Sequence, residues 1–196
     1  MSRGPNKQFE PEVALERAME VFWERGYEAA SLAQLLQQMG ISRKSMYDTF
    51  GNKQSLFLKA LEHYAQTELR AIAEQLLASG SPLSNLEQLL SNWQQAHGQP
   101  QSKGCLIGTC AADFNTSDVQ IAPVLHSYYC RLENIYYEAI ALAQKAGELN
   151  PKAQTRDLAK ILLYTTQGMA LIGRVSDSKT MPRSVVSLTI ELLKKA

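Results

Sequence analysis

The sequence predicts an all-α protein of about nine helices, with a three-helix N-terminal helix-turn-helix domain joined by a shared long helix to a larger helical domain. Two observations support this fold class. Apolar residues recur at spacings of three and four along most of the chain, which is the period of a half-buried helix. Strand-like alternation is missing from the sequence, and clusters of Gly, Pro, Asn and Ser divide it into helix-sized segments.

The N-terminal segment predicts three short helices, over about residues 11–25, 31–38 and 42–49. Pro11 suits an early helical position, and Gly26 ends the first helix. Gly40 ends the second helix, and Ser42 is a suitable N-cap for the third. The apolar stripe expected on the first helix consists of Val13, Ala14, Ala18, Val21 and Phe22.

Six further helices are expected. Asn52 caps a fourth helix that runs to about residue 79, and a fifth follows the break at 80–85 and ends near residue 96. After a loop at 97–104 we expect a short helix over 105–114 and a long one from residue 117 or 118 to about 146. The last two helices cover about 152–175 and 181–194.

The bulk composition excludes several classes of protein. A hydrophobic content of 45% supports a packed core, and 11 Gly and 7 Pro are too few for a fibrous or disordered chain. No apolar run is long enough to cross a bilayer, and residues 1–10 lack the apolar stretch of a signal peptide. Three cysteines suit a reducing compartment. We therefore expect a cytoplasmic protein without a membrane partner.

A specific order of residues stands out between about 10 and 58. It comprises Ala18, Phe22, Gly26-Tyr27, Ser31-Leu32, Leu35, Gly40-Ile41-Ser42, Met46-Tyr47-Asp48-Thr49-Phe50, Asn52-Lys53 and Leu56. This ungapped series resembles the N-terminal domain of TetR-family transcriptional regulators. The resemblance implies a DNA-binding domain over 1–58 and a helical effector-binding and dimerisation domain over 59–196, with the boundary inside the fourth helix.

The same resemblance implies a function. We expect a ligand-responsive regulator, usually a repressor in this family, that binds a pseudo-palindromic operator in double-stranded DNA as a homodimer and is released by a small-molecule effector. The sequence contains no spaced metal ligands, nucleophile elbow or phosphate-binding loop, so neither an enzyme nor a cofactor is expected. A helical interaction protein that has lost DNA binding is the other alternative, and the intact cationic third helix disfavours it.

The candidate DNA contacts fall into two groups, because phosphate contacts position a protein and base contacts specify the site. By resemblance, the phosphate contacts are Ser31, Tyr47 and Lys53. The base-reading candidates on the exposed face of the third helix are Arg43, Lys44, Ser45, Asp48 and Thr49, with Ala33 and Gln34 of the second helix at the groove edge. Met46 and Phe50 point the other way and are expected in the core. The alternative is that Ser31 and Asn52 only cap their helices and that Tyr47 only packs against Leu36.

Effector binding is expected in the larger domain, where apolar helices carry aromatic and polar-tipped side chains. The candidate ligand contacts are Tyr64, Trp93, Cys110 and Tyr128, although each also suits an ordinary helical core. A neutral or weakly polar, partly aromatic ligand is expected, since no buried charge cluster is apparent.

Cys105 opens the sixth helix within the sequence KGCLI at 103–107. This resembles the stretch that opens the same helix in a TetR subgroup, some of whose members sense oxidants or electrophiles through that cysteine. A thiol at a helix N-terminus beside Lys103 favours the reactive thiolate, but cysteines are also among the residues most often buried inertly. Both readings stay open from the sequence alone.

The last two helices are expected to form the dimer interface. The predicted face of the eighth helix comprises Leu163, Gln167, Gly168, Ala170, Leu171 and Arg174. Val185, Leu188 and Leu192 form a matching stripe on the ninth. Small residues among the apolar ones favour close helix approach across a two-fold axis.

Overall fold

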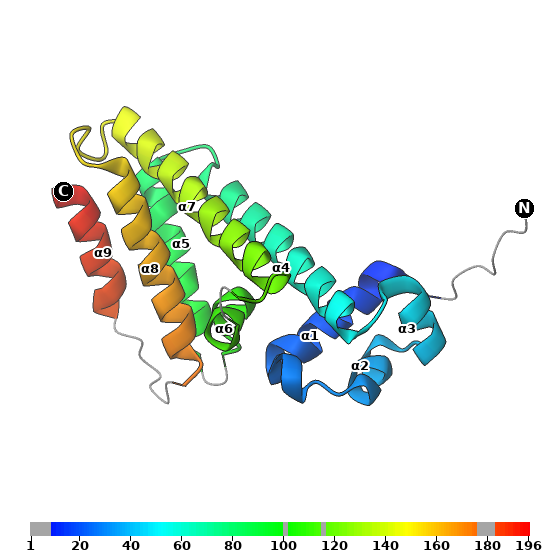
Figure 1. Ribbon diagram of the computed structural model, residues 1–196. Helices are drawn as coiled ribbons and strands as arrows, with labels where there is room; N and C mark the ends of the chain where they lie inside the picture. The colour runs from blue at the N-terminus through cyan, green and yellow to red at the C-terminus, as the bar shows by residue number, and fades with distance from the viewer. Residues whose placement is uncertain (1–8, 100–101, 115–116, 176–182) are drawn as a thin grey trace, which may run out of the picture. The chain divides into compact units, whose positions relative to one another are not determined.

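The computed structural model describes residues 9–99, 102–114, 117–175 and 183–196. Within these ranges all regular structure is α-helical and comprises nine helices, which confirms the predicted fold class (Figure 1). The chain divides into two compact units, one within residues 1–65 and the other within 66–196. Helix α4, Lys53–Leu76, contributes residues to both units.

The first unit contains α1 (Pro11–Ala29), α2 (Leu32–Met39), α3 (Arg43–Phe50) and the first half of α4. An aromatic cluster forms its centre: the ring centroid of Phe57 lies 4.9 Å from that of Phe22 and 4.8 Å from that of Tyr27. Ala14, Ala18, Val21 and Phe22 are buried as expected. The prediction for Val13 is wrong, because its side chain is 44% exposed at the edge of the stripe.

Gly26 interrupts α1 rather than ending it. Its φ of 76° and ψ of 171° are not helical, and a further helical turn continues to Ala29. A positive φ is accessible to glycine without the steric cost that a Cβ imposes. The expected stop at residue 25 is therefore the point where the helix breaks, and the segment after it leads directly to the cap of α2.

The second unit contains the rest of α4 with α5 (Pro82–His97), α6 (Leu106–Asp113), α7 (Ile121–Lys145), α8 (Thr155–Gly173) and α9 (Arg183–Lys195). Helices α7 and α8 pack against each other, and α5 packs against α7, α8 and α9 (Figure 1). The core between them includes the fully buried Tyr128, Leu132 and Tyr136.

Side-chain oxygens that accept hydrogen bonds from main-chain amides mark where two of these helices begin. Helix α5 starts at Pro82, earlier than expected, because Ser81 Oγ accepts a hydrogen bond of 3.0 Å from the Ser84 amide. Before α7, the Asp118 carboxylate accepts hydrogen bonds from the Gln120 and Ile121 amides at 3.1 and 2.8 Å. The expected first residues of the ninth helix, 181 and 182, lie outside the described residues.

The end of α5 lies very close to the end of α8. A Cβ placed on Gly173 would lie 3.1 Å from the carbonyl carbon of His97 and closer still to its oxygen. No real Cβ approaches a backbone carbonyl oxygen in this way, so the contact requires glycine. Gly173 thereby lets α5 and α8 meet backbone to backbone.

Candidate functional site

Helix α2 begins with a complete capping box. Ser31 Oγ accepts a hydrogen bond of 3.3 Å from the Gln34 amide, and Gln34 Oε1 accepts one of 3.1 Å from the Ser31 amide. The Ser31 hydroxyl also lies 2.9 Å from Gln34 Oε1. Both residues are therefore held by each other, while Ala33 between them is exposed. The box fixes the start of α2.

Helix α3 is capped in the same manner. Ser42 Oγ accepts a hydrogen bond of 3.0 Å from the Ser45 amide and lies 2.9 Å from the Ser45 hydroxyl. Arg43 and Lys44 in the first turn are exposed. The opposite face is buried, as predicted: Met46 is fully buried and Phe50 is 5% exposed. The cap and this inner face fix which side of α3 meets solvent.

The outer face of α3 presents chemically varied groups. Asp48 is exposed one turn after Lys44, and Thr49 is partly buried. Tyr47 is 47% exposed, which is high for a large aromatic side chain and argues against a purely packing role. Cations, a carboxylate and hydroxyls on one short helix are the side-chain types that read base edges and phosphates in a major groove.

Lys53, at the start of α4, points back toward the end of α1. Its Nζ lies 4.5 Å from the centroid of the Tyr27 ring and donates a hydrogen bond of 3.4 Å to the Glu28 carbonyl. The preceding Asn52 caps α4, since its Oδ1 accepts a hydrogen bond of 2.8 Å from the Ser55 amide. The ammonium is thus held near the N-terminus of α4 by groups of α1, which the sequence pattern did not reveal.

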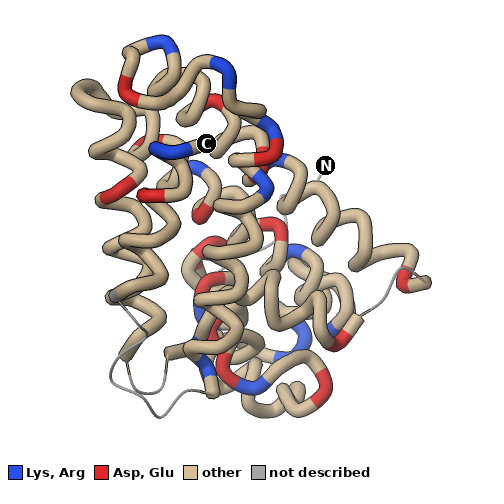
Figure 2. The backbone as a smooth tube through the Cα atoms, turned by 90° about the vertical axis from the view of Figure 1, so that its left-hand side faces the viewer, with Lys and Arg blue, Asp and Glu red and all other residues tan. Residues whose placement is uncertain are grey.

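Charges are distributed along the backbone in both units, with cationic and anionic positions interspersed (Figure 2). The net charge of the chain is only +1. Between residues 31 and 60, however, the cations Arg43, Lys44, Lys53 and Lys59 accompany one anion, Asp48. The local excess on and beside α3 is what phosphate attraction requires.

The second unit has a buried hydrogen-bond network at its centre. Trp93 Nε1 of α5 donates a bond of 2.8 Å to the Thr166 carbonyl of α8. The Tyr136 hydroxyl of α7 donates one of 3.1 Å to Thr166 Oγ1, which in turn bonds to the Leu162 carbonyl at 2.9 Å. Trp93 therefore has a structural partner on α8.

Cys105 and Tyr128 lie together, next to α6. Cys105 is 2% exposed, its Sγ accepts a hydrogen bond of 3.4 Å from the Gly108 amide, and the Tyr128 hydroxyl lies 3.9 Å from that sulfur. Burial raises the pKa of the Cys110 thiol to about 12, with a smaller contribution from Asp113. Tyr64, the fourth candidate ligand contact, belongs to the first unit, where its ring meets the Trp23 ring edge-on at 5.0 Å.

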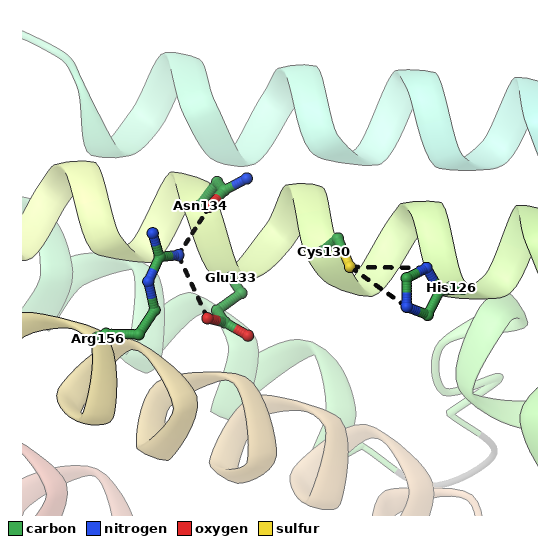
Figure 3. A network of polar contacts seen from close by, with 5 residues as sticks. All are labelled: His126, Cys130, Glu133, Asn134 and Arg156. Atoms are coloured by element: carbon green, nitrogen blue, oxygen red, sulfur yellow. Dashed lines mark hydrogen bonds and ion pairs between the residues drawn. The ribbon is translucent and has the colours of Figure 1, made fainter.

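The exposed thiol of the chain is Cys130, which the sequence reasoning overlooked. Its sulfur lies 3.7 Å from each ring nitrogen of His126, one turn earlier on α7 (Figure 3). Further along α7, Glu133 Oε1 and Asn134 Oδ1 accept hydrogen bonds from Arg156 of α8, at 3.3 Å and 2.7 Å. The spacing of four residues places His126 and Cys130 on one face of a helix, and this was the sequence pattern that could have indicated their contact.

Helices α8 and α9 present an apolar face to solvent. Its α9 part contains Leu188 and Leu192, 60% and 45% exposed, with Val185 half-buried. The exposed large apolar residues of α8 are Tyr164, Leu171 and Ile172, and the space above the partly buried Gly168 is open. The predicted face was wrong for Leu163 and Ala170, which are buried in the core, and for Gln167, whose side-chain amide is shielded from solvent beside Gly108 of α6. It also omitted Tyr164 and Ile172.

The residues that the structure describes lack two further features. They contain no helix that is long and apolar enough to span a membrane. They contain no group of three or more His, Cys, Asp and Glu side chains placed to hold a metal ion.

Comparison with known proteins places both units. Residues 14–60 match the family described as "Bacterial regulatory proteins, tetR family", and residues 82–188 match "Tetracyclin repressor-like, C-terminal domain". The HTH-type transcriptional regulator YezE of Bacillus subtilis (strain 168) is 31% identical over 194 residues, covering 97% of this chain and 99% of the relative. The HTH-type transcriptional repressor ComR of Escherichia coli (strain K12) is 29% identical over 196 residues, covering 97% and 92%.

A solved structure matches over nearly the full length. It is a cysteine mutant of the TetR family transcriptional regulator CifR in complex with a 26-base-pair double-strand operator DNA. It has a TM-score of 0.81 and 26% sequence identity, and the match covers 98% of this chain and 99% of that one.

Proposed function

The chain belongs to the TetR family, whose members are DNA-binding transcriptional regulators rather than enzymes, and from this membership we propose that it is a repressor. It binds a pseudo-palindromic operator as a homodimer and leaves it when a small molecule binds the second unit. The observation that carries the proposal is the capped helix α3, whose exposed face combines Arg43, Lys44, Tyr47 and Asp48. The ComR relative, a repressor by name, supports the direction of control.

We propose a division of labour among the DNA contacts. Arg43 and Lys44, in the exposed first turn of α3, read guanine edges, and Asp48 accepts from cytosine. Tyr47 and Lys53 bind phosphate oxygens, the latter near the free amides of the α4 N-terminus. Ser31 binds phosphate from the start of α2, Ala33 and Gln34 beside it meet the groove edge, and Ser45 and Thr49 complete the α3 surface. Ser31 and Gln34 keep their capping roles, because a backbone contact to phosphate does not require breaking the box.

The homodimer is proposed to form through α8 and α9. Tyr164, Ile172 and Leu188 are 69%, 61% and 60% exposed, and such large apolar side chains are rarely left in water as a group. Tyr164, Gly168, Leu171 and Ile172 fall on one helical stripe by their spacing of three, four and eight residues. The open space above Gly168 lets a partner helix approach closely. A two-fold axis here mirrors the two-fold symmetry of the operator.

Release by an effector is proposed to act through α4. This helix holds residues of both units, and Asn52 and Lys53 stand at its start. An effector needs only to bind more tightly to the form of the dimer that does not fit the operator. A coupling of about 1–3 kcal/mol changes operator affinity roughly 5–150-fold, and linkage requires operator DNA to weaken effector binding by the same factor.

A mobility-shift assay on the DNA upstream of the protein's own gene tests the proposal. The wild-type protein should retard this DNA and leave an unrelated fragment of equal length free at the same salt concentration. The Arg43→Ala/Lys44→Ala double variant should lose the preference, whereas Lys59→Ala, exposed on α4 outside the proposed contacts, should keep it. Equal retardation of both fragments by the wild type would contradict specific operator binding.

A further inference from the structure

Gln167 of α8 has an amide whose hydrogen-bonding capacity is unused. Its Oε1 and Nε2 are both shielded from solvent, and neither has a hydrogen-bond partner among the described residues. Its neighbour Thr166 is fully engaged with Trp93, Tyr136 and the Leu162 carbonyl. A buried polar group left unpaired is unfavourable, so native proteins seldom retain one without a function.

The orphan amide faces α6. A Cβ placed on Gly108 would lie 3.2 Å from Gln167 Oε1, 3.5 Å from Cys105 Cβ and 3.9 Å from Cys105 Sγ. Gln167 therefore reaches the same turn of α6 that Cys105 caps, and Cys105 in turn adjoins the Tyr128 hydroxyl. Side chains from α6, α7 and α8 thus converge around Gly108.

The groups that converge here are polar but uncharged. Burial, reinforced by Cys105 and Cys110, raises the pKa of Tyr129, so its hydroxyl stays protonated. Arg174, a cation of α8's C-terminal end, donates a hydrogen bond to Thr109 Oγ1 on the same turn of α6. The environment around Gln167 therefore suits a neutral molecule and disfavours an ionised one.

We propose that the effector of the regulator pairs with Gln167 through an amide-like edge, in which an N–H donor stands beside a carbonyl acceptor. The Gln167 carboxamide offers an N–H donor and a carbonyl acceptor. Only a ligand that has an acceptor and a donor of its own can pair with the two at once. Lactams, imides, ureas and primary amides have this edge, whereas ketones and esters satisfy the donor alone. The inference rests on the proposed function, because it names the ligand class of the proposed effector unit.

Matched probes test this on the full-length protein. δ-Valerolactam has the amide edge, N-methyl-δ-valerolactam lacks the N–H donor, and cyclohexanone keeps only the ring and the carbonyl. The fluorescence of Trp93 reports binding, because its indole N–H donates a hydrogen bond to the carbonyl of Thr166, next to Gln167. Trp23→Phe removes the only other tryptophan. In this background we expect δ-valerolactam to bind on the order of tenfold more tightly than either analogue.

Two variants locate the effect. Gln167→Met keeps the length of the side chain and removes its hydrogen bonds, so it should bind all three probes with equal affinity. Gln88→Met, on an exposed residue of α5 that pairs with Asn92, should keep the preference for the lactam. Equal affinities for the three probes in the Trp23→Phe protein, or no binding of any of them, would overturn the inference without using a Gln167 variant. So would a lactam preference that survives in Gln167→Met.

Operator binding distinguishes this inference from the proposed function. Gln167 lies in the second unit and α3 in the first, so Gln167→Met should retard operator DNA like the wild type. Operator binding without lactam preference would leave the repressor proposal standing and refute only the ligand class. Lactam preference without operator binding would refute the repressor proposal and leave the ligand class standing.

Discussion

The ammonium of Lys53 lies over the ring of Tyr27, 4.5 Å from its centroid. The pair joins the start of α4 to the end of α1, with Glu28 accepting a hydrogen bond from the same nitrogen. Lys53 thus has a packing partner within the first unit as well as its proposed phosphate. The cation–π contact contributes on the order of 0.5–1 kcal/mol at a partly exposed site.

Lys53→Ala should therefore affect both stability and DNA binding. We expect the free energy of unfolding to fall by about 1 kcal/mol, measured by urea denaturation. Affinity for all DNA sequences should fall alike, and the slope of log K against log salt should decrease by about one. Lys59→Ala is the matched control, being exposed on the same helix. A salt slope that Lys53→Ala leaves unchanged would exclude the phosphate contact.

Arg43→Ala should change specificity rather than affinity alone. A bidentate contact to guanine contributes about 1–3 kcal/mol of discrimination, so the variant should tolerate substitutions at particular operator base pairs. Binding to a library of single-substitution operators measures this. Arg43 is exposed and makes no described contact in the core, so its loss should leave the unfolding free energy within roughly 0.5 kcal/mol of wild type. If the variant binds every operator in the library more weakly by the same factor, Arg43 contacts only the phosphate backbone and does not read bases.

Leu171→Glu/Ile172→Glu should convert the dimer to a monomer. Each side chain is about half exposed or more in the single chain, and burying that remainder in a dimer contributes roughly 1–2 kcal/mol. Light scattering at micromolar concentration measures the mass. Leu142→Glu on α7 is the control, with a similar exposure of 41% outside the α8–α9 face. A wild-type protein that is already monomeric would refute the homodimer.

Cys130 should react first with a thiol reagent such as dithiobisnitrobenzoate. It is exposed beside His126, whereas Cys105 and Cys110 are buried and react only when the fold opens. The raised pKa of Cys110 further limits its thiolate at neutral pH. One fast thiol equivalent is expected, and Cys130→Ser should abolish it. A fast phase that persists in this variant would instead favour the oxidant-sensing reading of Cys105.

Mild acid should destabilise the protein through His97. Burial lowers the pKa of this imidazole from 6.5 to about 4, so the folded protein resists a proton that the unfolded chain accepts. The stability that the neutral His97 imidazole contributes is fully present above pH 6.5 and is lost as the pH falls toward 4. The loss should reach about 1–3 kcal/mol, after allowance for partial solvent screening. Urea midpoints between pH 7 and 4 measure it, and His97→Phe, which retains a ring against Trp93, should flatten the curve.

Local features were the most predictable from the sequence. The caps Ser31, Ser42 and Asn52 depend on side chains that bond within three residues, so sequence order alone identifies them. The inward face of α3 follows from helical period. The exposed face of α8 did not follow from helical period. Apolar residues surround most of that helix, so a stripe could be drawn through either Leu163 or Tyr164.

Contacts between distant segments could not be read from the sequence. Lys53 and Tyr27 are 26 positions apart, and no spacing rule joins them. The unpaired amide of Gln167 is likewise a property of three packed helices, and its type and position gave no sign of it. Periodicity specifies which face of a helix is buried, but it does not specify which polar groups meet there.

The contact of Gly173 with the His97 carbonyl also bears on how this sequence can change over time. Every missense change in a glycine codon adds at least a Cβ, and a Cβ at position 173 collides with a backbone atom that no side-chain rotation can move away. Enlarging substitutions in cores are usually absorbed by neighbouring side chains. Helix α8 therefore contains one position where mutational drift is blocked by another element's main chain, whatever residue occupies position 97.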